Sequence, residues 1–395
     1  MTDSTDPNPN EAVPAQAALR DWLINQSLPL WGEAGWDERT GLFVESLDEL
    51  GQPLSDLPRR LMVQARQIFV FSVAAKRGWS GDARHRVERA ADAMIRFYHQ
   101  RDGNPGWVFS VDRAGTPVDP RRDFYTLSFV LLALANWAEI SGDRRALFLA
   151  DETLDFLDSH MAHPESGYVD GLPLPADGQL RQNPHMHLLE AVLALHRVKP
   201  GAAYLDRARS LVSLLQSRFL QGRPRVLAEF FDSDWAVRGG ADVSFEPGHH
   251  FEWVWLLWLY AKLAGDPLPE VAASLWSAAA EFGLGPSLMI YDEASLGRGV
   301  LQRSTRLWPY CEAAKAARIL SPSTSASADF LTALQTRFLT PAVRGSWVDR
   351  FDADGVPKSR LAPASSLYHI CCALDMLEHY GADEVSRVHA SAVTA

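Results

Sequence analysis

Histidine and glutamate side chains recur in this sequence inside stretches that are otherwise apolar. The stretch EPGHHFEWVWLL, residues 246–257, places His249 and Glu252 three positions apart, so both lie on one face of a helix. The residues WLLWLYAKLA, which begin at 255, are apolar at almost every position, which predicts a helix buried on all sides. A buried helix keeps such polar groups only where they have partners or face a wet cavity. The pattern therefore indicates either satisfied core residues or a site for acid–base chemistry.

Polar residues of this kind occur in each of six apolar stretches, at a nearly constant interval. Taken one per stretch, they are Arg66, Tyr125, His187, His249, Glu312 and His369, with steps of 59, 62, 62, 63 and 57 residues. Three further polar or aromatic residues accompany them in the third, fourth and fifth stretches: Asn183, Glu252 and Trp308. We expect these side chains to converge in one pocket.

Each of these residues also has a purely structural interpretation. Arg66 could form a buried ion pair with a glutamate of another stretch, and Glu312 could pair with Lys315 on its own helix. His187 and His369 could be core histidines bonded to backbone carbonyls. The nearly constant interval between these residues favours a common site, because six unrelated core residues would not be expected to recur at one interval.

Periodicity and helix breakers predict the elements that must position these residues. We expect twelve helices, at about 11–28, 58–77, 83–99, 122–141, 143–161, 184–198, 202–219, 248–265, 268–282, 304–320, 325–338 and 363–380. Short stretches with the pattern of β-hairpins separate alternate pairs, at 41–53, 106–117, 167–178, 225–237, 288–299 and 345–357. Helices that are apolar all round alternate with amphipathic ones, which favours a closed ring over an open solenoid.

The predicted fold is therefore all-α, an (α/α)6 barrel of twelve helices with short β-hairpin loops between helix pairs. No linker interrupts the chain, so we expect a single domain over 1–395, with flexible tails at about 1–12 and 386–395.

Composition narrows the classes of function. The formal charge of −11 argues against nucleic acid as a partner. The three cysteines, two of them adjacent, suggest no disulfide framework, and the polar N-terminal stretch is no secretory signal, so we expect a cytoplasmic protein. The longest apolar stretch, near 251–264, is too short to span a membrane.

The sequence contains no phosphate-binding or dinucleotide-binding loop motif, and we expect no cofactor. It leaves open whether the protein is a monomer or a homodimer.

The motifs together resemble the N-acylglucosamine 2-epimerase superfamily, which includes mannose isomerase and related aldose–ketose isomerases. The resemblance rests on segments in family order: QAR (64–66), NPHMHLLEA (183–191), EPGHHFEWVWLL (246–257), LWPYCEAAKA (307–316) and YHI (368–370). The family fold is an (α/α)6 barrel. DFYTLSF, around Tyr125, departs from a family pattern nearer to DLYDxAF, which bears on substrate preference.

The resemblance implies roles for the predicted residues. His249 and His369 match the two acid–base histidines of the family. Residues around the sugar would be Arg66, Tyr125, Asn183, His187, Glu252, Trp308 and Glu312. The implied reaction removes the proton on C2 of an open-chain monosaccharide to form a cis-enediolate, with histidine as base and Arg66 stabilising the negative charge. We expect His369 to take the proton, His249 to return one, and Glu252 to orient His249.

The expected activity is conversion between D-mannose and D-fructose, with D-lyxose and D-xylulose as a minor pair. The alternative within the family is an N-acylglucosamine 2-epimerase or another sugar 2-epimerase. A different class is a glycoside hydrolase on the same barrel, for which Asp234, Glu252 and Glu312 are candidate carboxylates. A third class is a non-enzymatic scaffold, but such a protein would not require a pair of histidines.

We expect no catalytic metal, because the positive charge of Arg66 would repel a metal cation nearby. If a metal were bound, its ligands would be His187, His249 and Glu252.

Overall fold

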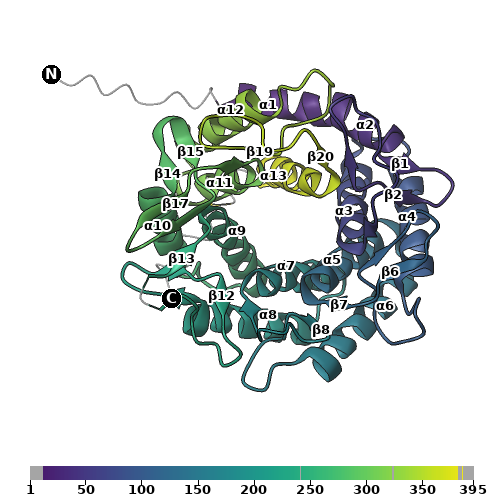
Figure 1. Ribbon diagram of the computed structural model, residues 1–395, viewed down its shortest axis with the longest axis horizontal. Coiled ribbons are helices and arrows are strands. Elements are labelled where there is room, and N and C mark those ends of the chain that lie inside the picture. Colours follow the sequence, from purple (N-terminus) through teal and green to yellow (C-terminus); the bar gives the residue numbers. More distant parts are fainter. Residues whose placement is uncertain (1–11, 241, 323, 381–384, 386–395) are drawn as a thin grey trace.

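The inner helices form the wall of a closed ring. The computed structural model describes residues 12–240, 242–322, 324–380 and 385, and Figure 1 shows the ring viewed end-on. The inner helices are α3 (Leu61–Arg77), α5 (Phe124–Ser141), α7 (Asn183–Val198), α9 (Pro247–Ala264), α11 (Trp308–Leu320) and α13 (Leu367–His379). Each packs on the next, and α13 packs on α3. The predicted (α/α)6 barrel is confirmed.

The outer helices cover the inner ring. They are α1 (Ala12–Trp22), which continues through a π-helical turn (Leu23–Ser27) into α2 (Leu28–Glu33), then α4 (Ala83–Tyr98), α6 (Arg144–Phe156), α8 (Ala202–Leu214), α10 (Val271–Gly283) and α12 (Ala326–Phe338). π-Helical turns also extend α6 (Leu157–Met161) and α8 (Leu215–Phe219). In α4 the buried positions recur every three or four residues, as expected for an amphipathic helix.

Burial on all sides distinguishes the inner helices. In α9, all the residues from Pro247 to Ala261 are buried. α5 is long and apolar enough by composition to cross a membrane, but 78% of it is buried inside the protein. Its apolar character is that of an inner barrel helix. α3, α5 and α9 each end on a glycine in the left-handed conformation, Gly78, Gly142 and Gly265, which allows the chain to turn back toward an outer helix.

Six antiparallel strand pairs link successive repeats at the N-terminal end of the inner helices. They are β4 (Arg59–Arg60) with β5 (Ser110–Val111), β7 (Arg122–Asp123) with β8 (Gly171–Leu172), β9 (Leu180–Arg181) with β12 (Phe230–Phe231), β13 (Ser244–Phe245) with β16 (Glu293–Ser295), β18 (Thr305–Arg306) with β19 (Arg350–Phe351), and β20 (Ala362–Pro363) with β3 (Ser46–Leu47). The last pair joins the final repeat to the first and closes the ring.

Local pairs complete the strand structure. They are β1 (Trp36–Asp37) with β2 (Leu42–Phe43), β5 with β6 (Pro117–Asp119), β10 (Leu220–Gln221) with β11 (Val226–Leu227), β14 (Leu284–Gly285) with β15 (Met289–Ile290), and β16 with β17 (Gly299–Gln302). Short 3-10 turns lie at Pro286–Leu288 and Ala364–Ser366. In three of the loops, Asp48, Asp112 and Asp352 each accept two backbone N–H groups, from two and four positions further along the chain.

Two details of the predicted elements are wrong. The stretch 167–178 is not a hairpin: β8 pairs with β7, and Pro173 and Pro175 supply no N–H groups for a local ladder. The predicted helices 58–77, 122–141, 304–320 and 363–380 begin too early, because their first residues form the strands that link the repeats. Of the predicted flexible tails, Ala12 begins α1, and the remaining residues lie outside the described part of the chain.

Candidate active site

The first two turns of the inner helices surround a cavity of about 240 Å³. Its lining residues are Arg66, Tyr125, Asn183, His187, Glu246, His249, Glu252, Arg306, Trp308, Asp349, Ser365, Ser366 and His369. Eight of the nine predicted residues line it; the ninth, Glu312, lies directly behind His369. The N-terminal ends of the inner helices direct their positive dipole ends toward this cavity, which favours negative charge within it.

Trp308 lies between the two predicted acid–base histidines. Its ring centroid is 5.1 Å from that of His249 and 5.3 Å from that of His369, with an interplanar angle of 33° in both cases. Pro247 occupies the first turn of α9, where a missing N–H costs nothing. Trp308 packs against Gly248, the next residue, leaving no room for a side chain there. The EPGHH motif thus starts the helix and accommodates the tryptophan that separates the histidines.

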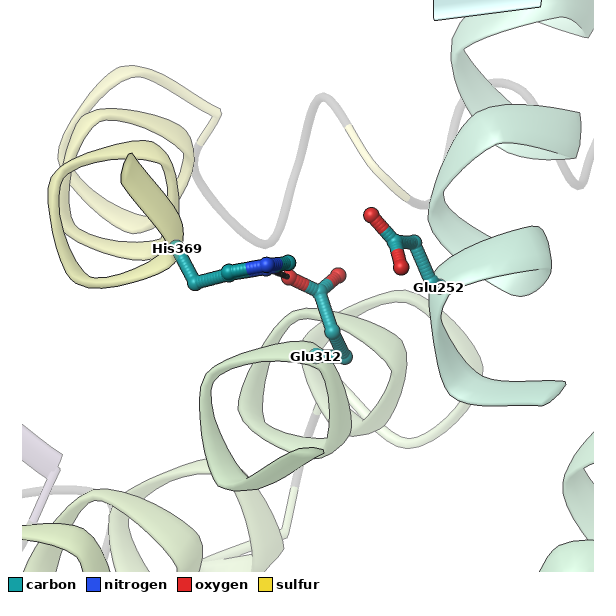
Figure 2. A group of neighbouring side chains, drawn as sticks. All are labelled: Glu252, Glu312 and His369. Atoms are coloured by element: carbon teal, nitrogen blue, oxygen red, sulfur yellow. Dashed lines mark hydrogen bonds and ion pairs between the residues drawn. The ribbon is translucent and has the colours of Figure 1, made fainter. Parts of the chain in front are cut away.

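His369 is held by Glu312. The Nδ1 atom of His369 lies 2.8 Å from Oε1 of Glu312 (Figure 2). The other carboxylate oxygen of Glu312 lies 2.6 Å from Nζ of Lys315, an ion pair buried on both sides. Burial lowers the pKa of His369 well below its usual value, and the positive charges of Arg66 and Lys315 lower it further. His369 is therefore neutral, with Nδ1–H donating to Glu312 and the Nε2 lone pair left to act as a base.

His249 is held by a different carboxylate, Glu229. Nδ1 of His249 lies 3.0 Å from both carboxylate oxygens of Glu229. Burial alone would lower the pKa of His249, but the negative charges of Glu229 and Glu246 outweigh it and raise the pKa to about 9. His249 is therefore a cation at neutral pH. The expectation that Glu252 orients His249 is wrong. The residue that contacts Nδ1 of His249 is Glu229, which lies in the loop between β11 and β12.

His187 lies against aromatic rings and a third glutamate. Its ring centroid is 4.4 Å from that of Phe129 and 5.2 Å from that of Tyr125. Its Nδ1 is 3.4 Å from Oε2 of Glu190, which also accepts a hydrogen bond from the Tyr368 hydroxyl. Burial lowers the pKa of His187 to about 4 despite this carboxylate. His187 therefore enters the cavity as a neutral imidazole.

Arg66 projects into the same cavity without a carboxylate partner. It donates to the Tyr125 hydroxyl over 2.6 Å and to the carbonyl of Ser365 over 3.1 Å. Its guanidinium carbon lies 4.1 Å from the centroid of Phe129, a cation–π contact. Within the described part of the chain, no acidic residue forms an ion pair with Arg66, so its buried-ion-pair interpretation is wrong. Its charge remains available to an anion in the cavity.

Glu252 is a buried carboxylic acid. Its Oε1 lies 4.0 Å from Nδ1 of His187. Burial, reinforced by the negative charge of Glu312, raises the pKa of Glu252 well above its usual range. A neutral carboxyl group can donate a hydrogen bond to a substrate oxygen at neutral pH.

Glu252, Glu312 and His369 also have the arrangement of a possible metal site. Their candidate ligand atoms all lie within 4.8 Å of one another (Figure 2). This group shares only Glu252 with the metal ligands considered from the sequence, which were His187, His249 and Glu252. The ammonium of Lys315 already neutralises Glu312, and a second cation beside it would be repelled. The donor set fits a proton-transfer site better than a metal site.

Sequence reasoning missed several residues of the site. Glu229 holds His249, Glu190 holds His187, and Asp349 lines the cavity while accepting a hydrogen bond from the Ser366 hydroxyl. Glu229 stands alone in the apolar run LAEFF, and an isolated acid in such a run is a signal of a buried polar role, whereas Asp349 is followed by Arg350 and gave no such signal. Thr126, where the expected family pattern has an aspartate, instead bonds Asp123.

The hydrolase candidates do not form the required pair. Asp234 lies on an exposed turn and does not line the cavity, whereas Glu312 is fully buried behind His369. Of the three candidates, Glu252 alone lines the cavity, so no two of them flank a sugar bound there.

Comparison with known proteins places this geometry in a family. Residues 41–373 match the sequence profile of the N-acylglucosamine 2-epimerase (GlcNAc 2-epimerase) family. The chain is 37% identical to a mannose-6-phosphate isomerase of Rhizobium meliloti (strain 1021), over 91% of this chain and 96% of that protein. It is 26% identical to a cellobiose 2-epimerase of Bacteroides fragilis, over 73% and 78% of the two chains.

A solved structure of a D-mannose isomerase superposes with a TM-score of 0.80 at 21% identity, over 96% of this chain and all of that one, which shows a common fold. The length of the sequence match and the identity to the Rhizobium protein establish the relationship. The chain belongs to the N-acylglucosamine 2-epimerase family of isomerases and epimerases.

Proposed function

We propose that this protein is an aldose–ketose isomerase that interconverts D-mannose and D-fructose, with D-lyxose and D-xylulose as a minor pair. The observation that carries the proposal is the contrast between two histidines that border one tryptophan. His369 is neutral, because burial and the positive charges of Arg66 and Lys315 lower its pKa, and His249 is cationic, because Glu229 and Glu246 raise its pKa more than burial lowers it. Two titratable groups with opposed pKa shifts in one cavity are the usual mark of a base and an acid.

The proposed reaction begins on the open-chain sugar. Nε2 of His369 takes the proton from C2, the electrons of that bond form a C1–C2 double bond, and the carbonyl electrons move to O1. Arg66 and the cationic His249 stabilise the negative charge of the resulting cis-enediolate. His369 then returns its proton to C1, while His249 gives a proton to O1 and recovers the one that leaves O2. The product is the ketose, and both histidines regain their starting state.

The difference between the histidines favours an isomerase over an epimerase. A 2-epimerase that works in both directions needs one group on each face of C2, and each must act as a neutral base in one direction and as a protonated acid in the other, so the two pKa values should be similar. An isomerase that moves one proton between C2 and C1 on the same face needs only one base and a separate acid. A neutral His369 and a cationic His249 match the second requirement.

The dimensions and charge of the cavity support a single unphosphorylated sugar. Pockets for drug-sized ligands occupy about 300–1,000 Å³, and this cavity, at about 240 Å³, is smaller. Three acidic residues line it, Glu246, Glu252 and Asp349, of which Glu252 is protonated, and Arg306 is already paired with Glu246 and Asp292. Among the described residues that line the cavity, Arg66 is the cation without an acidic partner, so a phosphate dianion would meet these acidic residues with Arg66 as its counter-charge.

The test is NMR of product and deuterium content after incubation in deuterium oxide. We expect D-mannose to give D-fructose, with deuterium entering C1 of fructose and C2 of mannose. D-Mannose 6-phosphate and N-acetyl-D-mannosamine should react at least tenfold more slowly. Formation of D-glucose without fructose would contradict the isomerase and support a 2-epimerase, and preference for the N-acetyl sugar would support the N-acyl epimerase named by the family.

A further inference from the structure

Glu229 belongs to a buried chain of hydrogen bonds that runs from Trp253 through Gln182 and Glu229 to His249 at the cavity. Its Oε2 accepts from Nε2 of Gln182 over 2.9 Å, and its Oε1 accepts from the backbone N–H of Glu246 over 3.2 Å. Gln182 is fixed in turn, because its Oε1 accepts from Nε1 of Trp253 over 2.9 Å. Both carboxylate oxygens of Glu229 then lie 3.0 Å from Nδ1 of His249. These contacts fix the orientation of the carboxylate and of the imidazole.

The two histidine-holding carboxylates differ in their remaining partners. Glu312 is neutralised by the ammonium of Lys315, so it presents little net charge to His369. The other donors to Glu229 are a side-chain amide and a backbone N–H, which carry no charge. The negative charge of Glu229 is therefore free to stabilise a cation on His249, and the low dielectric of the interior strengthens that effect.

Other titratable groups also act on His249. Glu246 is 4.0 Å from Nδ1 but is paired with Arg306, and Glu252 carries a raised pKa of its own. The remaining groups whose charges interact with His249 are Glu312 on α11, His187 on α7 and His250 on α9. Of the acids, Glu229 is the one that contacts the imidazole with both oxygens.

We infer that Glu229 is a positioning residue that keeps His249 oriented and cationic, and thereby determines which of the two histidines is the acid. The inference rests on the proposed function for its effect on the reaction, but its effect on His249 is independent of any substrate. Without the charge of Glu229, burial would leave His249 neutral, like His369. The cavity would then hold two neutral imidazoles, and His249 would have no acidic proton to give to O1.

The direct test is an NMR titration of the His249 imidazole in the protein without substrate. In the unaltered protein we expect a pKa near 9. In Glu229→Gln the pKa should fall below the ordinary value of about 6.5, while Glu229→Asp, which keeps the charge, should retain most of the elevation. Glu165→Gln is the matched control, since it removes an exposed carboxylate paired with Arg218 and should leave His249 unchanged.

Two results would overturn the inference. One is a His249 pKa that stays near 9 in Glu229→Gln. The other is a pKa at or below 6.5 in the unaltered protein, which needs no variant and therefore decides the matter even if Glu229→Gln fails to fold.

Kinetics with D-mannose extend the test to the reaction. In Glu229→Gln the alkaline limb of kcat/KM should move to lower pH by at least two units, and kcat/KM at pH 8 should fall roughly tenfold or more. The acidic limb, which reports His369, should stay in place. If the unaltered protein does not act on D-mannose, the proposed function fails, while the titration still decides the role of Glu229.

Discussion

Gly248 lies so close to Trp308 that a Cβ atom built on the glycine would stand 2.5 Å from the tryptophan ring. This contact joins the start of α9 to the start of α11 and holds Trp308 between the two histidines. The tight packing is therefore part of the site, although neither residue exchanges a proton.

Replacing this glycine should damage the site more than the fold. Gly248→Ala would force Trp308 to move, at a cost of about 1–3 kcal/mol of overpacking. We expect kcat/KM for D-mannose to fall at least tenfold, measured together with the midpoint of urea unfolding. Gly81→Ala, where a Cβ meets open space, should change neither quantity. Unchanged kinetics in Gly248→Ala would mean that the position of Trp308 has no bearing on the reaction.

The buried pair of Glu312 and Lys315 should be costly to break from one side. Glu312→Gln leaves an uncompensated ammonium, and Lys315→Met leaves an uncompensated carboxylate, so each should lower the free energy of unfolding by about 3–5 kcal/mol. The double variant should lose less than the sum. Urea unfolding of the four proteins measures the coupling, and strict additivity would contradict the ion pair.

The two histidines should differ in how they affect deuterium exchange. His369→Ala removes the base and should abolish both turnover and the exchange at C2 of D-mannose, a loss of about 10²–10⁴-fold. His249→Ala should abolish net conversion but leave slow exchange at C2, because His369 remains. NMR in deuterium oxide separates the two effects. Equal exchange in both variants would reverse or remove the proposed assignment.

The rate should be greatest between the pKa values of the two histidines. Below its depressed pKa, His369 becomes protonated and cannot act as a base, so kcat/KM rises as pH increases through that value. Above about 9, His249 loses its proton and can no longer act as an acid, so kcat/KM falls. Steady-state kinetics from pH 4 to 10 should give a bell that is still near its maximum at pH 8. A decline that begins near 6.5 would contradict a cationic His249.

Register along the chain was sufficient to locate most of the site. Arg66, His187 and His369 are far apart in sequence, but each stands at an equivalent place in an apolar helix, and equivalent places in a ring must converge. Glu229 was missed because it lies in a loop outside that register. The overlong starts of four predicted helices have a similar cause, since pairing with a distant strand decides where those helices begin.

Periodicity along the chain predicts the alternation of buried and amphipathic helices, and with it the closed ring and the residues that line the cavity at the N-terminal ends of the inner helices. Those features follow from short-range periodicity and from the burial of apolar side chains, which can be read along one chain. Which carboxylate is neutralised depends on the folded arrangement: Lys315 pairs with Glu312, the partner of His369, whereas among the described residues His249 is the only cation paired with Glu229. That difference depends on through-space charge in a medium of low dielectric, where a few ångströms determine which imidazole carries the proton.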